Sequence, residues 1–442
     1  MAERLSAAAD GVALHELVVE LFPLARSIAG PDFRRTLAVL EREAGPMLRH
    51  AFSTGEQVFD WTVPPEWELR RAWIRGPGGE TVVDSRDTNL HVVSHSRPVH
   101  AHLSLDELQG HLHSLPAQPD AVPYRTSYYE DAWGFCLADR VRRGLLDGTY
   151  EVMVDAALGP GRVEVGEIVV PGTTDREVLF STYCCHPSMA NNELSGPVVV
   201  VRLARELAQR PRPPRLTYRF VFVPETIGAI AYLSRVGERL RERLVAGYVI
   251  TCVGTPFPFR YRSSRRGASL ADRVAEHALV HLGAPWERLD FYPPRSDERQ
   301  YCSPGFDLPV GCLSRVDFDR WPEYHTSLDD LAHVTPEALG ESLRACRRLI
   351  DALEVNERFA VTVAHGEPQL GRRGLYPTLG GGMHAARQRD QLRDQMFLLN
   401  FCDGRPDLLA AAERCARPVW ELAPAVASLR HHGLLRRVDA ER

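Results

Sequence analysis

The chain has 442 residues, of which 44% are hydrophobic and 25% charged, and its formal net charge is −5. This length exceeds one ordinary hydrophobic core, so we expect two or three domains in a globular protein. The small net charge excludes a general attraction to nucleic acid or to anionic membranes, and no apolar run is long enough for a transmembrane helix. The first residues lack the order of a signal peptide, so we expect a cytoplasmic protein.

Two helices are predicted at the start of the chain. Apolar residues recur at helical spacing over residues 12–27, and a second helix is predicted over 35–43. Further on, alternating apolar residues, aromatics and turn pairs indicate short antiparallel strands, with a hairpin turn at Gly76–Gly79. We therefore predict a β-rich subdomain, residues 56–150, inserted into the rest of the chain.

Strands and helices alternate from Glu151 onward. Strands are predicted at 177–183, 216–223, 246–252 and 308–314, and helices at 196–209, 226–241, 269–282 and 336–354. Such alternation is typical of an α/β fold in which helices sandwich a mostly parallel sheet. Residues 1–55 and 151–365 would form this discontinuous core.

The last stretch, residues 366–442, is predicted to be a winged-helix-like domain. It opens with a polar, glycine-rich linker over 366–382, which three helices and a strand-like end follow. The stretch contains 12 Arg against 9 Asp or Glu, a surplus too small to indicate binding to nucleic acid. Winged helices also serve as dimerisation modules, so we expect a homo-oligomer.

Four loops after apolar runs hold the polar residues that suit catalysis. They contain His186 with Asn192, Glu225, Ser296–Arg299, and Glu323–Thr326. In an α/β fold such loops meet at one edge of the sheet, where ligands bind. Two histidines with several carboxylates are what a zinc hydrolase needs, because one carboxylate must take a proton from water. Glu225 suits that role, since it ends an apolar strand where desolvation raises its pKa.

The same residues also have ordinary structural explanations. A single loop histidine is more often a surface or hydrogen-bonding residue than a ligand, and Glu225 equally suits a cap on the following helix. Asp297 with Arg299 suits a structural ion pair, and Asp329 with Asp330 suits a solvated turn. The nine cysteines are scattered without a CxxC pair, which indicates reduced, buried thiols.

The chain resembles bacterial aminopeptidase-like proteins that carry an inserted domain and a C-terminal winged helix. These belong to the zinc aminopeptidase and glutaminyl cyclase superfamily. The resemblance rests on HPSMANNELSG, VFVPETIGAIAYL, SDERQYCSPGFDLPVG and EYHTSLDDL, and LFPLARSIAG and the end domain also fit. It implies that His186 and His325 bind zinc, that Glu225 is the general base and that Asp297 is an acidic residue of the site.

Further candidates and departures follow from the same motifs. Arg299, Tyr301 and Tyr324 are candidate substrate-binding residues. The family loop usually reads AND, so Asn192 stands where a metal-binding aspartate is expected. Thr226 also stands where a two-zinc aminopeptidase carries a second glutamate ligand. We therefore expect one zinc ion, bound by the two histidines and the amide oxygen of Asn192, with Cys252 or Asp297 as alternative third ligands. Weak binding, or a site that has lost its metal, stays open as an alternative.

The predicted function is metal-dependent hydrolysis of an amide or peptide bond in a small aminoacyl or peptidyl substrate, in natural-product or polysaccharide biosynthesis. The inserted segment would wall the pocket and restrict it to short substrates. Two alternatives stay open: a non-hydrolytic descendant that binds or scaffolds, and a cyclase or acyl-transfer enzyme using the same pocket. The change at Asn192 favours the non-hydrolytic descendant, whereas retention of the other site residues favours an enzyme.

Overall fold

The computed structural model describes residues 2–292, 295–376 and 382–438, which fall into two compact units. The first comprises Met1–Asp272 and Ala284–Arg344, and the second comprises Arg273–Gly283 and Ala345–Arg442. Two helices, α7 (Leu270–Leu282) and α9 (Pro336–Val355), contribute residues to both units. Among the described residues, no helix has the length and the apolar character needed to cross a membrane.

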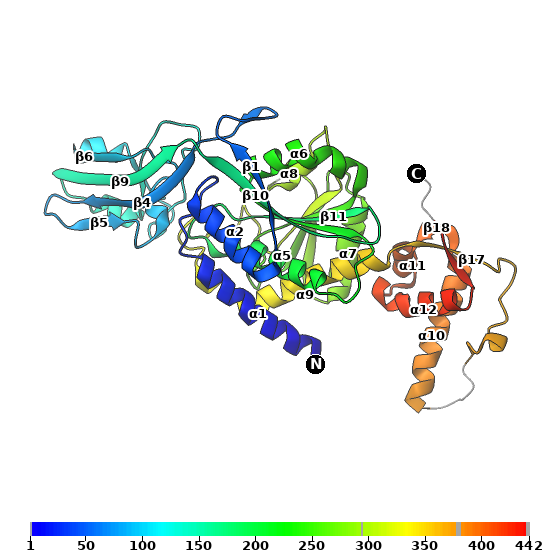
Figure 1. The fold of residues 1–442 in the computed structure, drawn as a ribbon. Coiled ribbons are helices and arrows are strands. Elements are labelled where there is room, and N and C mark those ends of the chain that lie inside the picture. The colour runs from blue at the N-terminus through cyan, green and yellow to red at the C-terminus, as the bar shows by residue number, and fades with distance from the viewer. Residues whose placement is uncertain (1, 293–294, 377–381, 439–442) are drawn as a thin grey trace. The chain divides into compact units, whose positions relative to one another are not determined.

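An eight-stranded sheet organises the first unit, in the order β1-β10-β12-β11-β13-β16-β14-β15 (Figure 1). The strands are β1 (Leu48–Ser53), β10 (Arg162–Val170), β11 (Glu177–Tyr183), β12 (Thr217–Val223), β13 (Leu244–Ile250), β14 (Phe259–Arg262), β15 (Trp286–Leu289) and β16 (Val310–Ser314). β12, β11, β13 and β16 run parallel. Every residue of β11 and β12 is buried, as expected where helices cover both faces. The predicted α/β fold is confirmed.

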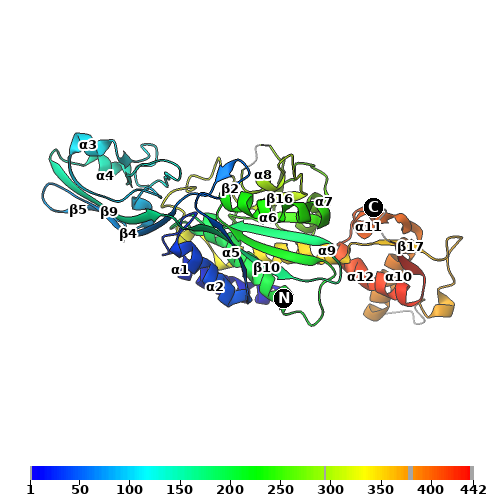
Figure 2. The same ribbon diagram turned by 45° about the horizontal axis from the view of Figure 1, so that its top comes forward.

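Helices lie on both faces of this sheet (Figures 1 and 2). One face carries α1 (Ala2–Leu21), α2 (Pro31–Ala44) and α5 (Ala190–Ala208), and the other carries α6 (Ile227–Arg243) and α8 (Glu298–Tyr301). Helix α5 begins upstream of its predicted start at residue 196. Its first turn therefore contains Asn192 and Glu193, which had been expected in a loop.

Asp329 caps the N-terminus of α5 from a distant segment. Its carboxylate accepts hydrogen bonds from the backbone N–H groups of Asn191 (2.7 Å) and Asn192 (2.9 Å). A carboxylate at this place satisfies free N–H groups and favours the helix dipole. Asp329 is fully buried, and burial raises its pKa to about 7. The interpretation as a solvated turn is wrong for Asp329, whereas Asp330 is exposed.

Gly196 brings α5 close to the end of β13. A Cβ atom at this position would lie 2.2 Å from the carbonyl oxygen of Ile250, so no larger residue fits without a shift. The loop after β13 is also bonded to α5, because Val253 donates its N–H to Ser195 Oγ (2.9 Å) and Gly254 donates to Asn191 Oδ1 (2.8 Å). The first turn of α5 is thereby fixed at the carboxyl edge of the sheet.

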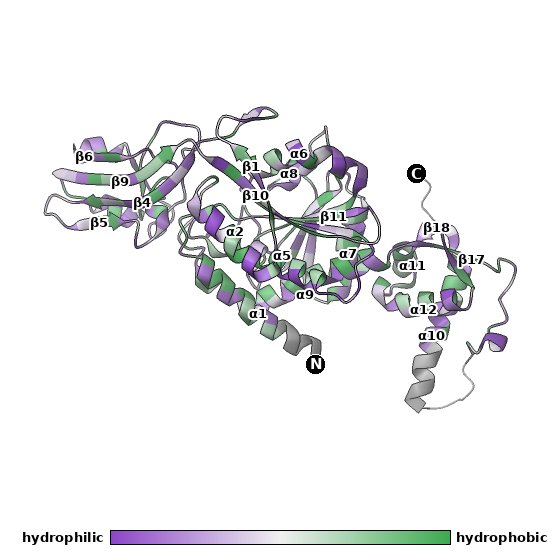
Figure 3. Ribbon diagram, in the orientation of Figure 1, coloured by the Kyte–Doolittle hydropathy of each residue, from purple (hydrophilic) through white to green (hydrophobic). Residues whose placement is uncertain are grey.

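The inserted segment forms a four-stranded antiparallel sheet in the order β5-β4-β9-β6. Its strands are β4 (Glu66–Arg75), β5 (Thr81–Asp84), β6 (Val99–Ser104) and β9 (Thr149–Gly159). Burial alternates along β9, and Figure 3 shows mixed hydropathy along these strands. The predicted turn joins β4 to β5, with Gly79 at a φ of 82°. The sheet extends to Gly159, beyond the predicted boundary at residue 150.

Shorter elements complete the inserted segment. They are β2 (Gln57–Val58), β3 (Trp61–Thr62), β7 (Leu112–His113), β8 (Phe135–Cys136), α3 (Leu105–Gln109) and α4 (Asp139–Arg143). Helix α3 begins with a capping box, in which Ser104 and Glu107 each bond the other's backbone N–H.

The second unit contains a three-stranded sheet in the order β18-β17-β19 and three further helices. Its elements are β17 (Arg358–Val361), α10 (Gly382–Phe401), β18 (Asp403–Asp407), α11 (Leu408–Cys415), α12 (Val419–His431) and β19 (Leu435–Val438). The three predicted helices and the strand-like end are present. The unit begins upstream of the predicted boundary at 366, because β17 is its central strand. Residues 377–381 of the predicted linker lie outside the described residues.

Candidate active site

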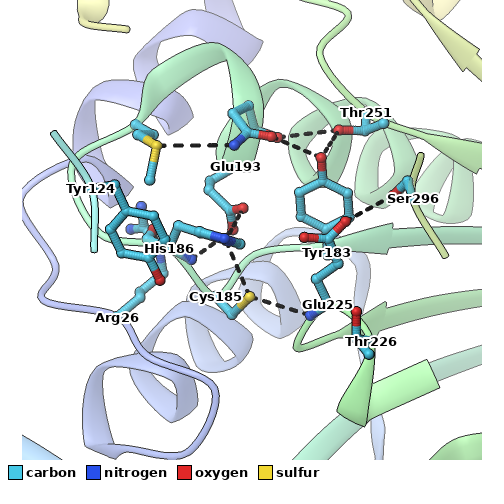
Figure 4. Close-up of polar contacts among 12 residues, drawn as sticks. Arg26, Tyr124, Tyr183, Cys185, His186, Glu193, Glu225, Thr226, Thr251 and Ser296 are labelled. Atoms are coloured by element: carbon cyan, nitrogen blue, oxygen red, sulfur yellow. Dashed lines mark hydrogen bonds and ion pairs between the residues drawn. The ribbon is translucent and has the colours of Figure 1, made fainter. Parts of the chain in front are cut away.

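The candidate site lies where β11, β12 and β13 end (Figure 4). Cys185 and His186 follow β11, Glu225 follows β12, and Thr251 and Cys252 follow β13. These are neighbouring parallel strands, so their following residues reach the same edge of the sheet, where open α/β folds bind ligands.

The structure brings together the two histidines that the sequence singled out. The ring centroids of His186 and His325 are 5.1 Å apart. Zinc binds imidazole nitrogens at about 2.0–2.1 Å in a tetrahedral arrangement, so two rings on one ion would have centroids roughly 5 Å apart. Nε2 of His325 is buried without a hydrogen-bond partner. Burial and the neighbouring His186 lower the pKa of His325 to about 3, so its ring is neutral at pH 7.

Glu193, which the sequence pattern did not predict, orients His186. Its Oε2 accepts the backbone N–H of His186 (2.8 Å), and its Oε1 forms an ion pair with His186 Nδ1 (Figure 4). Metal-binding histidines commonly donate their second ring nitrogen to a carboxylate in this way. Nε2 of His186 is thereby left for a ligand. The polar residues around Glu193 in the sequence gave no signal of this role, which only the burial of the first turn of α5 reveals.

Two segments remote from the sheet edge also contact His186. The fully buried Arg26 donates from Nε to the carbonyl oxygen of His186 (3.1 Å). Tyr124, from the inserted segment, lies 4.7 Å from the ring of His186 and 5.5 Å from that of His325, measured between centroids. Its hydroxyl is hydrogen-bonded to that of Tyr128 (2.5 Å). These contacts agree with the prediction that the inserted segment walls the site.

Glu225 is half-buried beside the histidines. Its Oε1 accepts a hydrogen bond from Ser296 Oγ (3.2 Å), and its backbone N–H donates to Cys185 Sγ (3.2 Å). Desolvation raises the pKa of Glu225; the nearby charge of His186 opposes this rise, and that of Glu193 adds to it. A carboxyl group with a raised pKa is suited to exchange protons near neutral pH.

Asp297 lies next to Glu225 and accepts the backbone N–H of Thr226 at Oδ1 (2.8 Å). Its Oδ2 is buried without a hydrogen-bond partner. Burial and the charge of Glu225 raise the pKa of Asp297. Thr226 has a φ of 65°, a conformation that non-glycine residues adopt mainly where the surroundings impose it, often at functional sites.

The three predicted substrate-binding residues have different positions. Arg299 donates from Nη2 to Thr226 Oγ1 (2.8 Å) and from Nη1 to the carbonyl oxygen of Arg295 (2.8 Å). Tyr324 stacks on His325, with centroids 3.9 Å apart. Tyr301 is fully buried, and its hydroxyl is bonded to Ser181 Oγ (2.8 Å). Arg299 and Tyr324 thus border the site, whereas Tyr301 lies behind it.

Asn192 is already bonded to other protein groups. Its Oδ1 accepts hydrogen bonds from the hydroxyl of Tyr183 (2.7 Å) and from Cys252 Sγ (3.5 Å), and its Nδ2 faces Met189 Sδ (3.9 Å). The amide oxygen that was expected to bind zinc is therefore not a free ligand. Cys252 is fully buried, and burial raises the pKa of its thiol, which agrees with a core residue.

The site contains buried donor atoms of the kinds that bind a divalent cation. The unpartnered His325 Nε2 and the unpartnered Asp297 Oδ2 are buried polar atoms, and such atoms normally bind a partner or a metal. Cys185, His186 and Glu193 place a sulfur, a ring nitrogen and a carboxylate oxygen within 4.8 Å of one another, although Glu193 already pairs with Nδ1 of His186. Nitrogen and carboxylate donors of this kind suit zinc.

Changing Asn192→Asp is expected to strengthen zinc retention. Aspartate can still accept the Tyr183 hydroxyl, and it adds the negative charge that a neutral amide lacks. Metal content of both proteins after the same dialysis measures the effect. Equal zinc content in the two proteins would show that residue 192 does not influence the ion.

Comparison with known proteins places the chain in a family. Residues 15–356 match a family described as a domain of unknown function, DUF4910, and residues 358–437 match a winged helix-turn-helix. Over 402 residues the chain is 39% identical to a Clostridium acetobutylicum protein named for polysaccharide biosynthesis with an aminopeptidase-like domain, and 91% of each chain is covered. The predicted C-terminal winged helix is confirmed.

Solved structures agree with this assignment. A crystal structure of a provisionally named peptidase from Clostridium acetobutylicum has a TM-score of 0.90 at 36% identity and covers 98% of both chains. The zinc aminopeptidase BSAP from Bacillus subtilis has a TM-score of 0.56 at 11% identity, covering 78% of this chain and 94% of that chain, and it shares the fold alone. The chain belongs to the DUF4910 family, as an aminopeptidase-like protein that ends in a winged helix-turn-helix domain.

Proposed function

We propose that the protein is a metal-dependent hydrolase that cleaves an amide bond in a small aminoacyl or peptidyl substrate, with one zinc ion at His186 and His325. The observation that carries the proposal is the pairing of the two imidazole rings, 5.1 Å apart, with an unpartnered Nε2 on His325. The aminopeptidase-like fold supports the same reaction class.

The residues around the histidines have complementary roles in this reaction. Zinc, when bound, would supply positive charge that polarises the substrate carbonyl and lowers the pKa of water. Glu225 takes a proton from the attacking water and returns it to the leaving amine. Ser296 holds the carboxyl group of Glu225 by its hydrogen bond of 3.2 Å, and the backbone bond to Cys185 fixes the residue at the end of β12.

Substrate selection would follow from the walls of the site. Tyr124 contacts both histidine rings, and this wall would restrict that side of the site to a short group. Asp297 offers an unpartnered carboxylate oxygen to a substrate ammonium group, and Arg299 and Tyr324 border the same space. The relative named for polysaccharide biosynthesis suggests that the amide belongs to that kind of pathway.

Metal analysis of the purified protein tests this proposal. The protein is expected to retain about one zinc ion per chain, and His325→Ala is expected to lose both the ion and hydrolysis of aminoacyl amides. His100→Ala is the matched control, because His100 is an exposed histidine of the inserted sheet that pairs with Glu151. A protein that takes up no metal, and whose hydrolysis a chelator leaves unchanged, would contradict the proposal.

A further inference from the structure

Three exposed aromatic side chains gather at the edge of the inserted segment. Phe59 and Tyr129 are each 56% exposed and Trp61 is 37% exposed. The rings of Trp61 and Tyr129 are in contact, with centroids 5.8 Å apart and planes at 69°. Single exposed apolar residues are ordinary, but a group of them beside a candidate site commonly marks a binding surface. We call Phe59, Trp61 and Tyr129 the aromatic rim.

The aromatic rim and the candidate active site are both formed in part by the segment that carries Tyr124, Tyr128 and Tyr129. Tyr129 directly follows Tyr128, whose hydroxyl is bonded to that of Tyr124 (2.5 Å). Tyr124 in turn contacts the rings of His186 and His325. One segment of the chain thus supplies both a rim residue, Tyr129, and the tyrosine that contacts the two histidines.

Phe59, the third residue of the rim, packs near the segment that carries Ser296 and Asp297. The ring of Phe59 contacts that of Phe306, with centroids 5.7 Å apart. Phe306 lies in the turn that follows α8, the helix that begins at Glu298 beside Ser296 and Asp297. Figure 2 shows β2 beside α8. The β2–β3 hairpin thus extends from the segment that carries Asp297 to the segment that carries Tyr128.

The hairpin holds its aromatic side chains in place before any ligand binds. Val58 is buried and pairs with Trp61, and Gln57 pairs with Thr62. Gln57 Nε2 donates to the carbonyl oxygen of Phe59 (2.7 Å), and Phe59 has a φ of 55°. A bulky residue in this conformation is rare and often found at ligand sites. Binding to such a fixed surface loses little conformational entropy.

A sugar ring matches the chemistry of this surface. A pyranose has C–H groups on its faces, which the electron-rich face of an aromatic ring attracts, and hydroxyl groups around its edge. Exposed carboxylates flank the aromatic rings, namely Asp60, Glu130 and Asp131, and carboxylates accept hydrogen bonds from hydroxyl groups. The name of the relative that is 39% identical also refers to polysaccharide.

We infer that the aromatic rim is a carbohydrate subsite, which binds a pyranose ring of a glycan whose amide group reaches His186 and His325. This inference rests on the proposed hydrolase function and names its substrate class: an aminoacyl or acyl amide of an amino sugar. In this arrangement a pyranose ring of the glycan packs on Trp61 and Tyr129 while the amide group lies at the histidines.

The kinetic test compares two substrates that share one scissile glycyl amide. One is glycyl p-nitroanilide, and the other is a glucosamine disaccharide whose amino group carries glycine. Trp61→Ala is expected to lower kcat/KM for the disaccharide about tenfold, through KM, and to change it less than about twofold for the nitroanilide. Trp61→Phe keeps a ring and is expected to restore most of the loss. Tyr376→Ala, at an exposed tyrosine of the second unit, is the control.

A binding test separates the subsite from catalysis. Calorimetry with the glycyl disaccharide and the Glu225→Gln protein measures binding without turnover. Combining Glu225→Gln with Trp61→Ala is expected to weaken disaccharide binding about tenfold, as in the kinetic test. Binding to the rim without hydrolysis of any amide would support the subsite and reject the proposed function. Absence of disaccharide binding, or equal losses for both substrates in Trp61→Ala, would overturn the inference.

Discussion

Glu225→Gln is expected to lower kcat for hydrolysis of aminoacyl amides by about 10²–10⁴-fold, the usual contribution of a general base. Glutamine has the same shape and keeps an oxygen that accepts the hydroxyl of Ser296, so the fold is retained. It has no carboxylate to take a proton from water. Steady-state rates on aminoacyl p-nitroanilides, with zinc content measured on the same samples, show whether the chemistry alone is lost.

A matched control uses a carboxylate remote from the site. Glu238→Gln changes the same group on α6, where Glu238 pairs with Arg241 on the surface (2.8 Å), and its rate is expected to equal that of the unchanged protein. Full activity of Glu225→Gln would reject the assigned role. A loss of zinc from Glu225→Gln would instead show that Glu225 is a ligand.

Arg219→Leu is expected to lower the free energy of unfolding by about 3–5 kcal/mol, the usual effect of removing one partner from a buried ion pair. Arg219 on β12 forms ion pairs with Glu167 on β10 and Glu177 on β11. All three side chains are buried, so leucine leaves two carboxylates without their shared counter-charge. Urea unfolding of both proteins at about pH 7 measures the difference.

The same substitution should alter the pH dependence of stability. Burial alone would raise the pKa of Glu167, but hydrogen bonds from His50 and Tyr232 and the charge of Arg219 lower it from 4.5 to about 2. A carboxyl whose pKa is lowered by folding contributes stability above its unfolded pKa, and loses it as the pH falls toward the folded value. The free energies of unfolding of Arg219→Leu and of the unchanged protein should therefore become more similar as the pH falls from about 4.5 to about 2.

An exposed ion pair supplies the control for Arg219. Arg70 pairs with Asp155 on the inserted sheet (2.6 Å), and both side chains are well exposed. Arg70→Leu is expected to leave the free energy of unfolding nearly unchanged, because surface ion pairs contribute little. Equal unfolding midpoints for Arg219→Leu and Arg70→Leu would show that the buried ion pairs of Arg219 do not stabilise the fold.

The elements that the sequence predicted best have strong local patterns. β11 and β12 each contain a short apolar run, Val178–Phe180 and Phe220–Val223, so residues 177–183 and 216–223 could be located within a residue or so of their observed bounds. The meeting of His186 and His325 also followed from the pattern, because loops after parallel strands share one edge of the sheet.

Residues with long-range roles could not be predicted in the same way. Glu193 and Asp329 look like surface carboxylates in the sequence, and only the packing of α5 against the His325 loop buries them. Tyr124 lies in a loop of the inserted segment, far from His186 in sequence, and no local pattern joins the two. Short strands such as β14 and β15 lack enough residues for a clear period.

The segment that carries His325 is fastened at both ends. Upstream, the carbonyl oxygen of His325 accepts the N–H of Tyr124 (2.9 Å), and Ser327 donates to the carbonyl oxygen of Val122 (2.9 Å). Downstream, Asp329 accepts hydrogen bonds from the first turn of α5 and caps that helix. Hydrogen bonds thus join a loop of the inserted segment to the His325 segment, and that segment to the helix bearing Glu193. Removing the inserted segment would deprive the His325 segment of its bonds to Val122 and Tyr124.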